Sequence, residues 1–163
     1  MTFKLSTVPA IVLAAVTGSF AQASDESPFF SDLSVGYQNA LYSSGISVKK
    51  PISEKLNLQG VAGIFGTVNS FQARGLYEFN PRANWAPYAQ AGVGMWSIDV
   101  GFASDTGLLL EAGVGVNYNL ASLESSLNRW TASAELSAGS ADFGGLVSNS
   151  AFGLGFGLHY KFN

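Results

Sequence analysis

The sequence contains no cysteine among its 163 residues. This absence excludes a disulfide framework, thiolate metal sites and cysteine nucleophiles. Histidine is almost absent too, because His159 is the only one, and any chemistry that needs an imidazole has one candidate residue. The stability of the protein must therefore come from packing and hydrogen bonding within the fold.

Long apolar runs are also absent. The run Val8–Val16 is far shorter than the roughly 20 residues that a transmembrane helix needs, and no later segment supplies one. It follows Lys4 and precedes the small-residue triplet Ala21-Gln22-Ala23, which is the layout of a secretory signal peptide. We therefore expect residues 1–23 to be a cleaved signal peptide and residues 24–163 to form one domain.

Charged residues are few, at 12% of the chain. The basic residues after the expected signal peptide are scattered, which argues against nucleic-acid binding; they are Lys49, Lys50, Lys55, Arg74, Arg82, Arg129 and Lys161. Glycine is abundant, with 19 residues, although few segments resemble long loops. The glycines are therefore expected to lie within regular structure.

The pattern that organises the chain is an alternation of apolar with polar or glycine residues. This period of two indicates β-strands with one apolar face, and turn-forming segments rather than helical patterns separate the strands. Evenly spaced strands of this kind are typical of an antiparallel sandwich or an up-and-down barrel. Eight strands are predicted, at Leu33–Tyr37, Ile46–Val48, Leu56–Ile64, Phe71–Phe79, Tyr88–Asp99, Leu108–Leu120, Trp130–Ala138 and Phe152–Phe162.

Two residues disturb the alternation. Leu109 falls on the polar side of its segment, and Trp96 falls on the side of Gln90, Gly92 and Gly94. For Trp96, either a β-bulge or a tryptophan that fills the interior of the fold would explain the position.

Glycine indicates which face is inside. A glycine-rich face weakens an exposed strand, whereas the interior of an eight-stranded barrel has room for little more than small side chains between large ones. The apolar face would then contact lipid, between two belts of aromatic residues. One belt is predicted at Tyr77, Phe79, Trp85, Tyr118, Trp130, Tyr160 and Phe162, and the other at Tyr42, Phe65, Phe71, Trp96, Phe102 and Phe152. The predicted fold is all-β, an eight-stranded antiparallel up-and-down transmembrane β-barrel, and the alternative is a soluble β-domain.

Three segments resemble the small eight-stranded outer-membrane barrels, the class of the outer-membrane protein A transmembrane domain, outer-membrane protein X and the opacity proteins. They are Pro87–Gly94, Glu111–Tyr118 and Gly157–Phe162. The resemblance implies integral location in the outer membrane of a Gram-negative bacterium and contact with its lipid and lipopolysaccharide. It also implies assembly by the barrel-assembly machinery, which would recognise Tyr160 and Phe162, although Asn163 follows the last aromatic residue. A closed barrel has no free strand edge, so we expect a monomer.

Charges of both signs lie on the predicted inner face. Isolated buried charges are costly and need partners, so we expect two ion-pair clusters, one at mid-height with Arg74, Glu111 and Glu135 and one nearer the periplasmic mouth. The second would draw on Lys49, Glu78, His159 and Lys161. Such an interior either closes the lumen or forms a narrow ion path, and closure is favoured because eight strands leave little bore.

Catalysis would require a serine beside His159 and a carboxylate that orients the ring. Ser34 and Ser47 would face the lumen and not a lipid substrate. Asp99, Asp105 and Asp142 offer no compact calcium loop, and Gly153–Gly157 lacks the strand-turn-helix context of a nucleotide loop. We therefore predict a non-enzymatic barrel for envelope structure or surface interaction, without metal or cofactor, and the alternatives are a minimal channel and a lipid-modifying enzyme.

Overall fold

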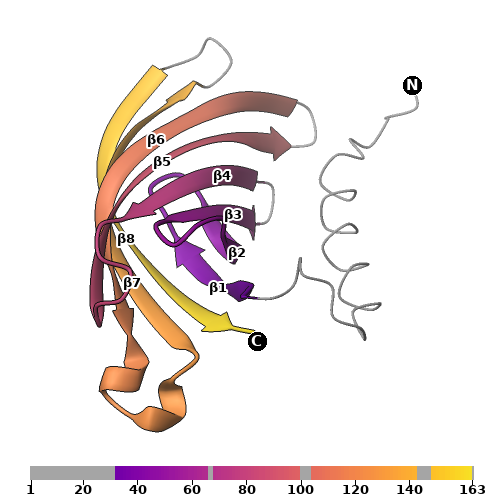
Figure 1. Ribbon diagram of the computed structural model, residues 1–163. Helices are drawn as coiled ribbons and strands as arrows, with labels where there is room; N and C mark the ends of the chain where they lie inside the picture. The colour runs from indigo at the N-terminus through magenta and orange to yellow at the C-terminus, as the bar shows by residue number, and fades with distance from the viewer. Residues whose placement is uncertain (1–31, 66–67, 100–103, 143–147, 163) are drawn as a thin grey trace. The chain divides into compact units, whose positions relative to one another are not determined.

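The computed structural model describes residues 32–65, 68–99, 104–142 and 148–162. They form a closed barrel of eight strands in which every strand pairs antiparallel with its neighbours in the chain and β1 pairs with β8 (Figure 1). This confirms the predicted all-β, eight-stranded antiparallel up-and-down barrel. The strands are β1 (Ser34–Asn39), β2 (Ser44–Pro51), β3 (Leu56–Phe65), β4 (Val68–Glu78), β5 (Trp85–Asp99), β6 (Ser104–Asn119), β7 (Trp130–Asp142) and β8 (Ser148–Lys161).

The two ends of the barrel differ. At the terminal end, where β1 begins and β8 ends, two short 3₁₀ helices, η1 (Leu120–Ser122) and η2 (Ser125–Leu127), lie between β6 and β7 (Figure 1). At the far end the connections between strands span only two to five residues, 40–43, 66–67, 100–103 and 143–147. In the described part of the chain, no helix is long and apolar enough to cross a membrane.

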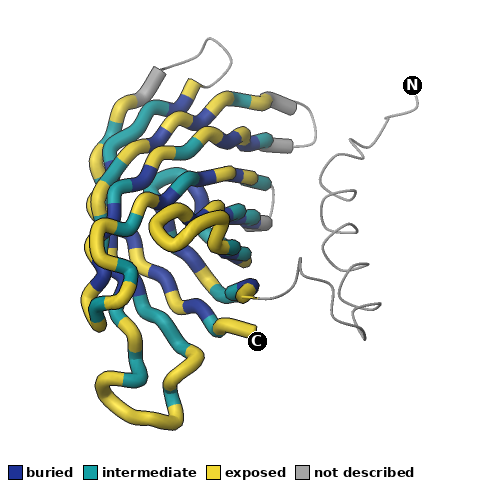
Figure 2. Tube along the Cα trace, in the orientation of Figure 1, coloured by how far each residue is buried: buried dark blue, intermediate teal, exposed yellow. Residues whose placement is uncertain are grey.

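Burial follows the predicted alternation, with buried and exposed residues taking turns along most strands (Figure 2). The polarity is the reverse of that in a soluble protein, where apolar residues dominate the interior. Among the described residues, fifteen polar or charged residues are buried but only nine hydrophobic ones, glycine apart. Large apolar side chains instead cover the outside, where Phe152 and Leu154 are 82% and 80% exposed.

Trp96 points into the barrel. The pairing of β5 with β6 runs without interruption from Trp85↔Tyr118 to Asp99↔Ser104, so β5 contains no bulge there and the second explanation for Trp96 is correct. Trp96 packs with Leu109 and Ala141, and the partly buried Tyr42 covers this cluster. The same packing explains why Leu109 departs from the alternation.

Glycines make room for the large interior side chains. Gly155 lies opposite Glu135, and Gly115 lies opposite Tyr88. A methyl group on Gly155 would stand 2.7 Å from Cγ of Glu135 and 2.5 Å from the carbonyl oxygen of Asn39. Gly75 differs, because it lies on the outer face and a methyl group there would meet nothing within 4 Å.

We predict opposite effects for alanine at these two glycines. Gly155→Ala should destabilise the barrel by about 1–3 kcal/mol, because the backbone carbonyl of Asn39 cannot move aside. Gly75→Ala should be neutral, or stabilising by up to about 1 kcal/mol, because it only restricts the unfolded chain. Urea unfolding of the refolded proteins in micelles measures both values. Equal destabilisation by the two variants would contradict the assignment of inner and outer faces.

Candidate functional site

Arg74 lies inside the barrel and is only 1% exposed. Its Nη2 lies 2.7 Å from Oε2 of Glu135 and 3.6 Å from Oε1 of Glu111. Its Nε donates a hydrogen bond of 3.2 Å to Oε1 of Gln90. One cation from β4 is therefore held between two carboxylates, from β6 and β7.

Neutral side chains complete this cluster. Oε2 of Glu135 also accepts a hydrogen bond of 2.9 Å from the Tyr88 hydroxyl. Glu111 accepts bonds of 2.7 Å from Gln90 and 3.1 Å from Gln72, and Gln90 also donates to Ser137 over 3.0 Å. We call these residues of β4 to β7 the Arg74 network: Gln72, Arg74, Tyr88, Gln90, Glu111, Glu135 and Ser137. Several donors on each carboxylate offset the cost of removing two anions and one cation from water.

A second cluster of interior side chains is held by hydrogen bonds that involve no charged residue. Nε2 of Gln59 donates to Oγ of Ser47 over 2.8 Å and to Oε1 of Gln38 over 3.2 Å. Nε2 of His159 lies 2.9 Å from the same Ser47 oxygen, and Ser133 donates to Gln38 over 3.5 Å. We call this the His159 network, and it is formed by β1, β2, β3, β7 and β8.

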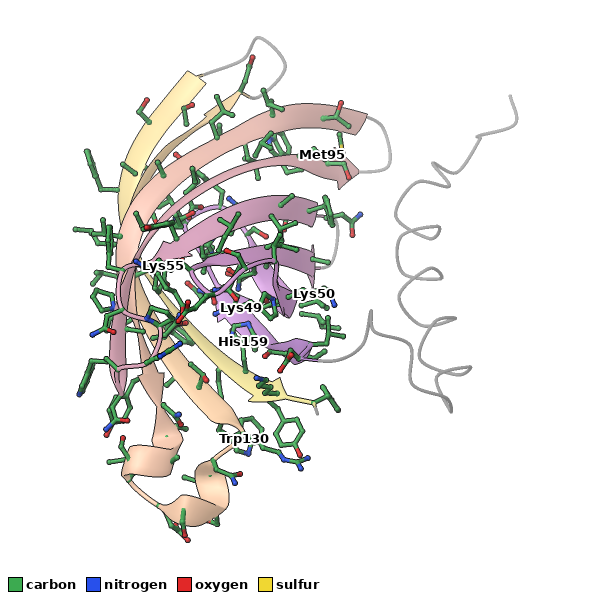
Figure 3. The ribbon with its side chains drawn as sticks, viewed as in Figure 1. Lys49, Lys50, Lys55, Met95, Trp130 and His159 are labelled. Carbon is green, nitrogen blue, oxygen red and sulfur yellow. The ribbon has the colours of Figure 1, made fainter. Side chains whose placement is uncertain are left out.

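The predicted ion-pair cluster near the mouth does not form among the described residues, which corrects the sequence-based prediction. Lys49 and Glu78 connect only through Asn117, at 3.5 Å and 2.7 Å. Lys49 and His159 lie near one another on the inner side of the barrel wall (Figure 3), but His159 hydrogen-bonds neutral partners.

Lys161 is not part of the interior at all. It is the last residue of β8, where its long side chain reaches solvent and pairs with Asp32 over 2.6 Å. The alternation assigned Lys161 to the inner side, but at the rim of a barrel the side chain can bend outward. The hydrogen bond and the charge of Lys161 hold the pKa of the Asp32 carboxyl below its usual range.

Sequence reasoning missed the uncharged members of both networks. Gln38, Gln59, Gln72 and Gln90 all share the strand side of the interior glycines and charges, and each is at most 4% exposed. That shared position was the available signal. The predicted inner face of this strand also left out Leu76, which is buried on the inner side of β4.

The Ser47 and His159 pair does not complete a catalytic triad. Both residues are buried, at 0% and 2% exposure, and Nδ1 of His159 has no hydrogen-bond partner among the described residues. A triad needs a carboxylate at that nitrogen. The described residues also contain no group of three or more metal-ligating side chains. The side chains of Asp99 and Asp105 lie outside the described part of the structure.

Aromatic residues form a belt on the outer face at the terminal end. The ring centroids of Trp85 and Tyr118 are 4.3 Å apart, and those of Trp130 and Tyr160 are 5.2 Å apart. Tyr77 with Phe79 and Tyr160 with Phe162 form edge-to-face pairs at 5.5 Å and 5.1 Å. Figure 3 shows Trp130 at this end.

The belt predicted for the far end is corrected in part. Phe71 and Phe152 are exposed. Trp96 instead points inward, and Tyr42 packs against it and donates a hydrogen bond of 2.9 Å to the Gly139 carbonyl. The Phe65 side chain and the whole of Phe102 lie outside the described part.

Two solved structures are similar to this barrel. The N-terminal β-barrel domain of Pseudomonas aeruginosa OprF matches with a TM-score of 0.58 and 16% identity, over 80% of this chain and 96% of that one. Neisserial surface protein A (NspA) matches with a TM-score of 0.53 and 19% identity, over 80% of this chain and 94% of that one. Both are eight-stranded outer-membrane barrels, and this chain has their fold.

Comparisons by sequence give no match. No protein-family model matches the chain. No curated protein matches it significantly.

We predict that Arg74→Met destabilises the barrel by about 3–5 kcal/mol, because it leaves Glu111 and Glu135 buried without a cation. The matched control is Arg82→Met, which breaks an exposed ion pair with Glu54 and should cost at most about 1 kcal/mol. Urea unfolding in micelles compares the two. Adding Glu111→Gln and Glu135→Gln to Arg74→Met should recover part of the loss, and no recovery would show that the effect is not electrostatic.

Proposed function

We propose that this protein is an integral barrel of the Gram-negative outer membrane, exported with a signal peptide of residues 1–23. The observation that carries the proposal is the apolar outer face. Exposed large apolar side chains lie on all eight strands, far more apolar surface than a soluble monomer leaves in water. Among the described strand side chains, the alternation directs only Lys50 and Asp142 outward as charges, one toward each end of the barrel.

The interior supports a closed lumen and a role in envelope structure or surface interaction. The hydrogen bonds of the Arg74 network join β4, β5, β6 and β7 across the interior, and the apolar cluster of Trp96, Leu109 and Ala141 lies nearer the far end. Water and ions would have to displace both layers to pass. A role as a minimal channel is therefore the weaker alternative.

The same features bear on catalysis and on the expected partners. The lipid-modifying role has little support, because Ser47 and His159 are buried away from the surface that would meet a lipid. The terminal end would face the periplasm, with Tyr160 and Phe162 as the signal for the barrel-assembly machinery. Lipid and lipopolysaccharide would cover the outer face of a monomer, and no cofactor is needed.

A refolding and conductance experiment tests this function. The chain without residues 1–23 should insert into lipid vesicles and migrate differently on a gel before and after boiling, as folded outer-membrane barrels do. In a planar bilayer the inserted protein should give no steady conductance, because both interior layers block the lumen.

The insertion and conductance measurements test separate parts of the proposal. A soluble protein with no heat-dependent shift would refute the membrane barrel. Steady conductance of an inserted protein, lost or altered in Arg74→Ala, would refute the closed lumen and favour the channel.

A further inference from the structure

A groove of about 430 Å³ lies on the outer face of the barrel, over β5, β6, β7 and β8. Small or compact residues that line it are Pro87, Gly115 and Ala134, and larger apolar residues that line it are Phe79, Leu136 and Leu154. Small residues beside large ones leave a depression that is apolar along nearly its whole length.

The groove rises from the terminal rim toward the middle of the barrel. Strand pairing places Phe79, Pro87, Val116, Ala134 and Phe156 in one row across the sheet. Counted from the strand ends at Trp85, Asn119, Trp130 and Lys161, the last four residues of this row lie two, three, four and five residues inside their strands. At about 3.4 Å per residue, the groove-lining Ala134 lies about 14 Å along β7 from Trp130, and the groove-lining Leu154 lies about 24 Å along β8 from Lys161. One end is therefore at the rim and the other is deep in the apolar belt.

Aromatic residues mark the membrane boundary beside the rim end. Trp85 and Tyr118 pair across the strands two residues nearer the terminal end than Pro87 and Val116, and their ring centroids are 4.3 Å apart. Aromatic belts of this kind lie at the level of lipid headgroups. A chain lying in the groove would thus start at headgroup level near Phe79 and run into the hydrocarbon.

Cations flank the rim end of the groove. The carbonyl of Lys55 accepts a hydrogen bond of 2.8 Å from the amide of Glu78, the residue directly before Phe79. The Lys55 side chain is exposed and has no ion pair or hydrogen bond within the described structure. Arg82 lies in the connection that begins at Phe79, and its side chain is 85% exposed. Glu54 pairs with Arg82 over 2.8 Å, and both side chains are exposed, so a phosphate here would meet the unpaired Lys55 and would share Arg82 with Glu54.

We propose that this groove binds one acyl chain of an anionic phospholipid from the periplasmic leaflet, and that Lys55 and Arg82 hold its phosphate. The inference rests on the proposed function, because it requires the outer face to lie in lipid and the terminal end to face the periplasm. The apolar groove fits the acyl chain and the cations at its rim fit the phosphate. Both features are needed, because only their adjacency distinguishes a lipid site from the general lipid-facing surface.

Native mass spectrometry of the refolded chain without residues 1–23 tests the groove. The protein is delipidated in detergent and then mixed with phosphatidylglycerol, or with phosphatidylcholine of the same acyl chains. The wild type should retain one phosphatidylglycerol, and Ala134→Trp, which fills the groove, should weaken retention about tenfold. The matched control Ala112→Trp adds the same side chain on the outer face outside the groove and should retain lipid as the wild type does. Leu154→Ala removes one border of the groove and gives a second, smaller loss.

The headgroup is tested by the double variant Lys55→Gln, Arg82→Gln. It should lose the preference for phosphatidylglycerol over phosphatidylcholine, whereas Arg129→Gln, on the same rim but bonded to Tyr160, should keep it. Equal retention of the two lipids by the wild type, or equal loss in Ala112→Trp and Ala134→Trp, would overturn the proposal. Heat-dependent migration is recorded for every variant, and only variants that fold as barrels are compared. A wild type that inserts but retains no lipid would refute only this site, whereas a wild type that fails to insert would refute the proposed function.

Discussion

The narrow interior of an eight-stranded barrel is the constraint on which the rest of the structure depends. The lumen is too small for large side chains on every strand at the same level, so large residues lie opposite glycines: Glu135 opposite Gly115 and Gly155, and Arg74 opposite Gly92. This arrangement brings Arg74 within 3.6 Å of both interior carboxylates. These ion pairs join β4 to β6 and β7 across the interior, and the proposal of a closed lumen is based on them.

The outer face follows from the same constraint. Because the polar residues and most of the strand glycines are used inside, the apolar side chains can only point outward, and they form the belt that a bilayer would cover. The outer glycines Gly60 and Gly75 contrast with the inner ones, since a methyl group on either meets nothing. Small outward residues, among them Ala134, also give the surface its relief. The groove beside the terminal end is one such depression, and Ala134 lies in it.

The period of two was enough to predict the eight strands, their antiparallel order and the inner side of each strand. It worked because a strand places alternate residues on opposite faces, and because glycine, scarce in exposed strands, marked the crowded face. The period does not give the height of a residue or the reach of its side chain. The pattern therefore did not predict the surroundings of Lys161, which lies at the rim, reaches solvent and pairs with Asp32. Contacts between distant strands, such as Tyr88 with Glu135, depend on register, which the sequence pattern alone does not supply.

Fluorescence quenching by brominated lipids tests most directly the claim that the apolar face meets lipid and the polar face encloses a filled lumen. The chain has three tryptophans, of which Trp85 lies outward at the belt, Trp130 lies in the same belt, and Trp96 lies inside. In variants that keep one tryptophan each, with phenylalanine at the other two positions, Trp85 and Trp130 should be strongly quenched and Trp96 should not. Strong quenching of Trp96 with weak quenching of Trp85 would contradict the assignment of the two faces.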